Sequence, residues 1–105
     1  MRTRKTADYH QELMKALQDP KEKAAYINAA LEDADKRVLL KALRNVAEAN
    51  GGMSRVATRA KLSRESLYRM LSEKGNPELS SLERLLSVLN LELRVIPHTH
   101  HAHAR

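Results

Sequence analysis

The segment of residues 53–72, MSRVATRAKLSRESLYRMLS, constrains the fold most, because its small and apolar residues recur at the spacing of two crossing helices. Ala57 is the small residue that a steep crossing of two helices requires. Leu62 is expected to tuck beneath the connecting turn at residues 61–63. The remaining inward positions of the pair are Val56, Ala60, Leu67 and Met70. This spacing predicts a helix-turn-helix.

The second helix of the pair, over residues 64–72, has a polar side that points away from those apolar residues. Arg64 and Arg69 each carry a guanidinium fork that can hold guanine O6 and N7, or a phosphate. Glu65 can accept from a cytosine amino group or orient an arginine, and Tyr68 can lie against a sugar or a thymine methyl. The complete set of residues that we predict to contact double-stranded DNA is Ser54, Arg55, Lys61, Ser63, Arg64, Glu65, Ser66, Tyr68, Arg69, Lys74 and Asn76.

The ends of the two helices account for the other residues of that set. Ser54 and Ser63 are expected N-caps, and the backbone N–H groups at helix N-termini suit phosphates. Lys61 stands where such turns usually have glycine, and a positive φ there costs about 1 kcal/mol. Either the turn differs slightly, or Lys61 gains a phosphate contact that offsets this cost. Lys74 and Asn76 follow the second helix and are expected to touch the DNA backbone.

The charge distribution supports a polyanionic partner. The chain has a formal net charge of +6, and residues 54–76 hold six basic side chains against two acidic ones. Residues 19–35 instead hold two basic side chains against five acidic ones. Two other interpretations remain open, since solvated helix faces give the same pattern and a basic face can also hold an acidic protein.

The remaining apolar residues predict further helices. The chain has no Phe, no Trp and three Tyr, so its core must come from Leu, Ala, Val, Ile and Met, which favours helix. Apolar stripes that include Leu31 and Val38 predict helices over residues 7–17, 20–32, 35–50 and 81–89. The expected N-caps are Asp19, Asp33 or Asp35, and Ser80, the last with a capping box completed by Glu83.

Residues 91–95, LELRV, alternate between apolar and charged side chains, which predicts a short strand. A single strand would leave its backbone groups unpaired, so we expect it to pair with the same strand of a second subunit in a homodimer. The predicted domain organisation is an N-terminal helical extension at 1–34, a DNA-binding domain with this strand at 35–96, and a disordered His-rich tail at 97–105.

No enzyme, cofactor or metal site is expected. The sequence has no nucleophile–base pairing, no Gly-rich phosphate loop, no H-E-x-x-H motif and no Cys. The tail histidines could bind a transition metal, although adventitious binding by a disordered end is the alternative: His98, His100, His101 and His103. No apolar run approaches the roughly 18 residues of a membrane span, and no apolar segment of a secretory signal follows the basic start. We therefore expect a cytoplasmic protein without a membrane partner.

The sequence resembles the HigA-like addiction-module antidote proteins, which belong to the Cro- and lambda-repressor-like helix-turn-helix group. The resemblance covers about residues 24–95 and is most specific in SRESLYRMLS followed by GNP. It implies an all-α, five-helix DNA-binding domain that works as a dimer. Lys61 and Asn90 depart from the family, which often has glycine at both positions.

The same resemblance implies the function. Such an antitoxin binds and blocks a RelE/HigB-like toxin, a ribosome-dependent mRNA endonuclease, and represses the operon that the two share. The acidic segment 19–35 is a candidate contact for a basic toxin; alternatively, its helix only packs on the domain and shows its charges to water. A stand-alone helix-turn-helix regulator and a helical protein-binding module without DNA binding remain the other candidate functions.

Overall fold

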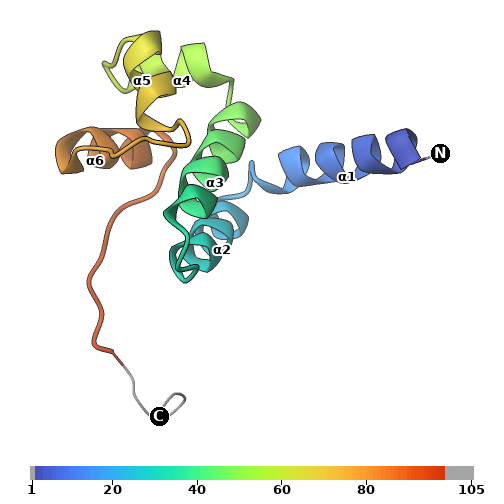
Figure 1. Cartoon of the computed structure of the whole chain (residues 1–105), viewed down its shortest axis with the longest axis horizontal. Coiled ribbons are helices and arrows are strands. Elements are labelled where there is room, and N and C mark those ends of the chain that lie inside the picture. Colours follow the sequence, from blue (N-terminus) through green and yellow to red (C-terminus); the bar gives the residue numbers. More distant parts are fainter. Residues whose placement is uncertain (1, 99–105) are drawn as a thin grey trace.

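The structure is a computed structural model that describes residues 2–98, with side chains from residue 6 onward, and it is helical (Figure 1). Its helices are α1 (Arg2–Ala16), α2 (Pro20–Leu31), α3 (Lys36–Ala49), α4 (Met53–Arg59), α5 (Arg64–Met70) and α6 (Leu79–Val88). The all-α class is confirmed for the described residues. The count of five helices is wrong, because this part of the chain contains six.

The predicted strand is not formed within the single chain. Residues 91–98 have neither helix nor strand structure and leave the body of the molecule as an extended segment (Figure 1). The physical reason is that this segment runs past the helices without another strand beside it, and a strand needs a partner for its N–H and C=O groups. The His-rich tail after His98 lies outside the described residues.

Three of the expected N-caps are confirmed by hydrogen bonds from backbone N–H groups. Oδ1 of Asp19 accepts from Lys21 at 3.2 Å, Oδ1 of Asp35 accepts from Arg37 at 3.0 Å, and Oγ of Ser63 accepts from Ser66 at 2.9 Å. These bonds satisfy N–H groups that have no partner inside the helix. Hydrogen bonds from the side chain and backbone of Arg37 also lower the pKa of Asp35 to about 2.

Two expected caps are wrong, because both helices begin earlier than their serines predict. The N-cap of α4 is Gly52, and Ser54 lies within that helix. The N-cap of α6 is Glu78, without a side-chain cap bond, so Ser80 lies in the first turn and forms no capping box with Glu83. Serine is a common cap, but it also occurs inside helices when packing sets the boundary, as it does here.

The helices α3, α4 and α6 end in the same kind of turn, in which the residue after the C-cap has a positive φ. An N–H then reaches back to a carbonyl five residues earlier, as in a Schellman motif. The positive-φ residues are Gly51 (116°), Lys61 (60°) and Asn90 (63°). The N–H to carbonyl pairs are Gly52 to Ala47 at 3.0 Å, Leu62 to Ala57 at 2.9 Å, and Leu91 to Leu86 at 2.8 Å.

Helix α3 lies at the centre of the fold and packs against α1, α2 and α4, while α4 also contacts α5 and α6. Its residues Leu43, Val46 and Ala47 are almost fully buried, and Ile27 of α2 belongs to the same core. Two members of the expected apolar stripes are instead exposed: Leu31 by 53% and Val38 by 39%. Both lie towards the end of a helix where no other helix covers the stripe, so periodicity alone overestimated its length.

A buried lysine joins three helices near the centre of the molecule. Lys23 of α2 is only 2% exposed, and its Nζ donates to the carbonyl of Leu89 at 2.8 Å and to Oδ1 of Asn50 at 3.0 Å. The Asn50 amide in turn donates to the carbonyls of Leu17 and Val46 at 3.0 and 2.7 Å. The carbonyls at the ends of α3 and α6 are thus satisfied by side chains rather than water.

Burial lowers the pKa of Lys23, and the nearby positive charge of Arg59 lowers it further. The two hydrogen bonds to oxygen atoms and the negative ends of the helix dipoles of α3 and α6 favour the ammonium form. Lys23 is one of the two basic side chains that would offset the acidic surface charge of residues 19–35 if it were exposed. Its burial removes it from that surface and leaves residues 19–35 more acidic outside than their composition indicates.

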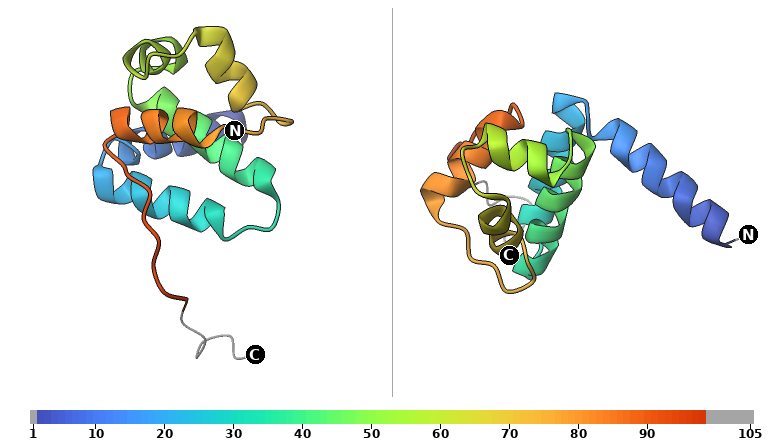
Figure 2. Two further views of the ribbon diagram at one scale, coloured as in Figure 1. Left: turned by 90° about the vertical axis from the view of Figure 1, so that its left-hand side faces the viewer. Right: turned by 90° about the horizontal axis from the view of Figure 1, so that it is seen from above.

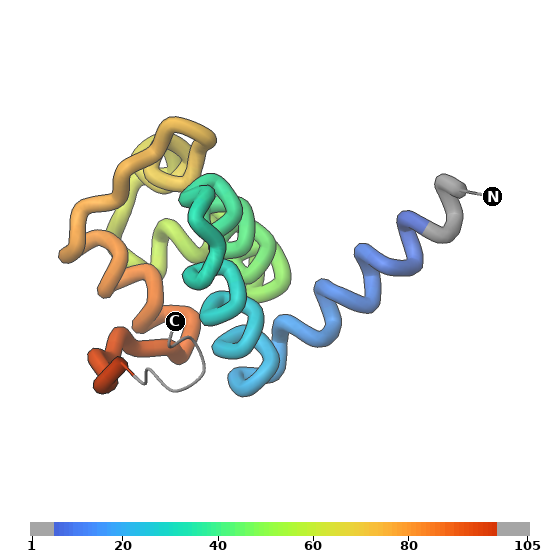
Figure 3. The backbone as a smooth tube through the Cα atoms, turned by 60° about the horizontal axis from the view of Figure 1, so that its bottom comes forward, coloured from blue at the N-terminus to red at the C-terminus, as the bar shows by residue number. Residues whose placement is uncertain are grey.

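The first helix projects from the body. Figures 2 and 3 show α1 extending away from the remaining helices, with its last turn next to them. Leu13, Met14 and Leu17 near that end pack against the core, whereas Tyr9 is exposed. None of the helices among the described residues has the combination of length and apolar character that a membrane span requires.

Candidate nucleic-acid interface

Helix α5 separates apolar and polar residues as its sequence predicts. Leu67 and Met70 point into the core, and Leu71 directly after the helix is fully buried. Four of the five α5 residues predicted to contact DNA are exposed, and the fifth, Ser66, is half-buried; the exposed four are Arg64, Glu65, Tyr68 and Arg69. This burial pattern fixes the orientation of α5, because Leu67 and Leu71, one helical turn apart, anchor the same side.

The turn between α4 and α5 has the positive φ that is typical of glycine at this position, although the residue is Lys61. Lys61 adopts a φ of 60°, and its side chain is exposed. The N–H of Lys61 donates to the carbonyl of Thr58 at 3.1 Å, and half-buried Leu62 packs against the core beneath the turn. Ala57, at 1% exposure, lies in the contact between the helices. The hydrogen bonds and the packing of half-buried Leu62 offset the strain at Lys61.

The exposed side of α5 is organised by contacts among its own residues. The guanidinium of Arg64 lies over the ring of Tyr68, 5.4 Å from its centroid. Ser63 Oγ donates to Ser66 Oγ at 2.8 Å, and the Arg69 guanidinium donates to that Ser66 hydroxyl at 3.5 Å. Such stacking restrains a long side chain while leaving its N–H groups available.

The predicted residues of α4, Ser54 and Arg55, lie in its first turn. Ser54 is exposed, and its carbonyl accepts from the Thr58 hydroxyl at 3.1 Å. Arg55 is also exposed, and its side-chain stem lies so close to Gly51 that an added Cβ there would meet Cδ of the arginine at 2.9 Å. Ser54 is therefore available for contact, but not in the capping role that the sequence assigned to it.

An open groove runs between α5, the loop of residues 71–78 and α6. Three basic side chains from these three elements line it: Arg69, Lys74 and Arg84. Asn76 and Glu78 line it as well, so one carboxylate lies among the three cations. No carboxylate of the described residues forms an ion pair with these three cations or with Arg64. The groove thus brings together Arg69, Lys74 and Asn76, three of the residues that the sequence predicts to contact DNA.

Arg84 is the member of this groove that the sequence analysis missed. Arg84 belongs to α6, for which the sequence predicts only packing against the core. The fold places it in the same groove as Arg69, although the two residues lie far apart in the sequence. The available signal was its place on the exposed side of α6, opposite buried Leu85 and Leu86. Within the described residues, no cluster of three His, Asp or Glu side chains could hold a metal ion.

The glycine of the loop is required by packing. A Cβ added to Gly75 would collide with the carbonyl group of Met70 and lie 2.9 Å from the carbonyl oxygen of Arg69. The N–H of Gly75 also donates to the carbonyl of Ser72 at 2.8 Å. Gly75 therefore lets the loop fold back onto the end of α5, which places Lys74 and Asn76 beside Arg69.

The fold and this surface define a small all-helical protein with a basic groove beside an exposed, arginine-bearing helix. A family model described as probable addiction module antidote protein matches residues 8–97. An uncharacterized protein of Haemophilus influenzae is 37% identical over 70 residues, which cover 67% of this chain and 71% of that protein. No solved structure gives a significant match. The chain belongs to this antidote family, and an antidote implies a toxin as its partner.

Proposed function

We propose that this antidote protein binds the operator DNA of its own operon through α4 and α5 acting as a helix-turn-helix. The observation that carries the proposal is the exposed side of α5, where Arg64, Glu65, Tyr68 and Arg69 lie opposite buried Leu67. A helix with this arrangement can enter the major groove while its apolar side stays in the core.

The contacts divide into base reading and phosphate binding. Arg64, held over Tyr68, and Arg69 supply guanidinium forks for base edges, and Glu65 can accept from a cytosine amino group. The phosphate contacts come from side chains around α5, the helix that would read the bases: Lys61 in the turn, Lys74 and Asn76 in the loop, and Arg84 across the groove.

The DNA proposal is tested by replacing Arg64 with alanine. We expect the variant to bind the DNA upstream of the operon about 5- to 150-fold more weakly, equivalent to about 1–3 kcal/mol, with relaxed specificity at one base position. Binding of both proteins should weaken steeply as salt rises, through counterion release. The measurement is fluorescence anisotropy with the operator and with single-base variants of it.

The matched control is Lys15→Ala, which removes one exposed positive charge from the last turn of α1, outside the helix pair. Unchanged operator affinity in Arg64→Ala would remove this residue from base reading. If the unaltered protein did not bind its upstream DNA at all, the proposal would fail and a protein-binding helical module would be favoured. DNA binding without an adjacent toxin gene would instead favour a stand-alone regulator.

The proposed biological role also includes repression of the operon and neutralisation of a toxin. The antitoxin acts in the cytoplasm as a homodimer, represses its operon, and neutralises a RelE/HigB-like mRNA endonuclease without catalysing a reaction itself. A two-fold dimer would present two reading helices about 34 Å apart to a pseudo-palindromic operator. Family membership supports the antidote role, and the acidic exterior of residues 19–35 supports contact with a basic toxin.

The toxin contact is tested by reversing exposed acidic charges rather than by deletion, because removing α2 would also remove core residues such as Ile27. We expect the double variant Glu22→Lys, Glu32→Lys to neutralise the co-expressed toxin less well, because like charges would face each other. Growth rescue and complex formation are the readouts. The control Glu48→Lys changes an exposed charge on α3. Full neutralisation by the double variant would exclude this surface.

A further inference from the structure

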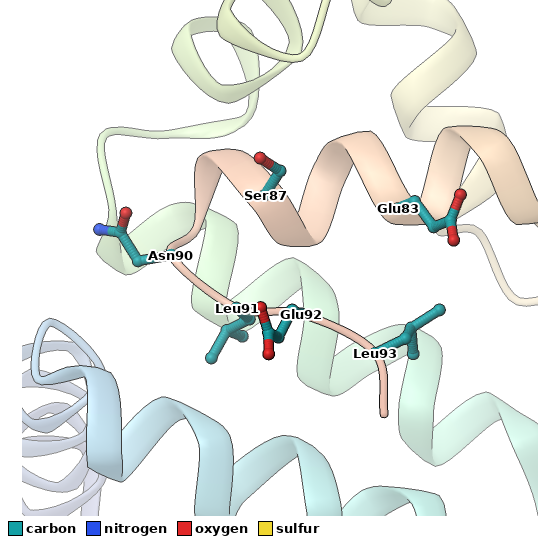
Figure 4. A pocket seen from close by; sticks show the side chains of 6 residues that line it. All are labelled: Glu83, Ser87, Asn90, Leu91, Glu92 and Leu93. Carbon is teal, nitrogen blue, oxygen red and sulfur yellow. The ribbon is translucent and has the colours of Figure 1, made fainter. Parts of the chain in front are cut away.

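The extended segment after α6 has unsatisfied backbone groups. The N–H of Leu91 closes the turn at the end of α6, but residues 92–96 make no backbone hydrogen bond to the described part of the chain. Figure 4 shows the segment running back alongside α6, and Glu83 and Ser87 of this helix line the same open pocket as the segment. An extended chain with free N–H and C=O groups is a template for pairing with another strand.

The side chains of this segment alternate as they would in a strand. Nε of Arg94 donates to Oε2 of Glu92 at 2.6 Å, which places these two side chains on one side. Leu93 and Val95 occupy the intervening positions, and they are 46% and 100% exposed. The segment therefore has one charged side and one apolar side. On the apolar side, Leu93 and Val95 are exposed in the single chain, whereas Leu91 is half-buried against the core.

We propose that the homodimer inferred above forms by antiparallel pairing of this segment with itself, about a two-fold axis at Leu93. The proposal deepens the proposed function by assigning the dimer interface. In this register Glu92 lies opposite the partner's Arg94, and Arg94 lies opposite the partner's Glu92. Leu91 then lies opposite the partner's Val95, so that like meets like on the apolar side and opposite charges meet on the other.

The charge pattern selects this register over its alternatives. Parallel in-register pairing would place each charge beside its own copy. An antiparallel pairing shifted by two residues would place Arg94 opposite the partner's Arg94. Like charges directly opposite each other are destabilising, whereas the register centred on Leu93 forms two ion pairs with a single sequence. This self-complementarity identifies a second copy of the chain as the strand that pairs with the segment.

The surface beside the segment provides the packing that two strands need. A two-stranded ribbon is only marginally stable in water unless it packs on something else. An open, mostly apolar groove lies between α2 and the segment, lined by Ile27, Leu31, Leu91, Leu93 and Ile96 among others. Glu92 and Arg94 of the segment and Lys21 of α2 also line it. Leu31 and Ile96 are exposed in the single chain, and dimerisation would bury them.

The test is a charge exchange followed by sedimentation velocity. Glu92→Arg alone and Arg94→Glu alone should each raise the dimer dissociation constant about tenfold or more, because both cross-strand pairs become repulsive. The double variant Glu92→Arg, Arg94→Glu should dimerise like the unaltered protein. An equimolar mixture of the two single variants should also form dimers, since the positive segment of one faces the negative segment of the other.

Glu48→Arg, on the exposed side of α3, controls for charge, and circular dichroism verifies that each variant is folded. A monomeric unaltered protein would overturn both the homodimer and this interface. An unaltered dimer whose single variants stay dimeric would overturn the interface alone. Single variants that dissociate but do not associate when mixed would overturn the register. None of these results depends on whether the protein binds DNA.

Discussion

The variant Lys23→Met is expected to be less stable than the unaltered protein by about 2–3 kcal/mol in its free energy of unfolding. Methionine fills a similar volume, but it cannot donate to the Leu89 carbonyl or to Oδ1 of Asn50. Both acceptors would then lose this donor, the Leu89 carbonyl in a buried place and Asn50 in a half-buried one. Removal of the desolvated ammonium recovers part of the loss, so the expected change is smaller than the sum of two charged hydrogen bonds.

Thermal and urea unfolding followed by circular dichroism measure this change, and a loss of that size corresponds to a fall in Tm of roughly 10–20 °C in a domain of this length. Lys21→Met is the matched control, because Lys21 is exposed on the same helix and should change stability by less than about 0.5 kcal/mol. Equal stability of the two variants would show that the buried lysine does not hold α2, α3 and α6 together.

The variant Gly75→Ala is expected to lose about 2 kcal/mol of stability and to bind DNA more weakly. The new methyl group cannot coexist with the Met70 carbonyl, and that atom belongs to the backbone and cannot rotate away. The loop must therefore move off the end of α5, which displaces Lys74 and Asn76 from the groove that they share with Arg69. Phosphate contacts made by these residues would weaken on all DNA sequences alike.

Urea unfolding and operator binding measured on the same samples test both consequences. Asn76→Ala is the control, because Asn76 is exposed and its truncation leaves the loop backbone in place. We expect this control to keep the stability of the unaltered protein and to lose only its own contact. A stable Gly75→Ala variant with unchanged operator affinity would contradict the role assigned to the loop.

The sequence by itself determined the local structure. Hydrophobic periodicity located the helices, and Asp19, Asp35 and Ser63 marked three helix starts, because an N-cap bonds only to backbone within three residues. Lys61 occupies a turn position that usually requires glycine, and the family resemblance indicates a second such position at Asn90; both adopt the positive φ. The division of α5 into a buried and an exposed side also follows from residue spacing alone.

Only the tertiary structure decided which side chains from distant parts of the sequence meet. The sequence does not distinguish Lys23 from a surface lysine, and its burial depends on the ends of α3 and α6 lying against it. Arg84 lines the same groove as Arg69 because α6 packs against α4. The exposure of Val38 and Leu31, and the lack of a strand partner for residues 91–95, likewise depend on what lies beside them. Capping and periodicity act over one or two helical turns, whereas burial and long-range hydrogen bonds depend on the packing of whole helices.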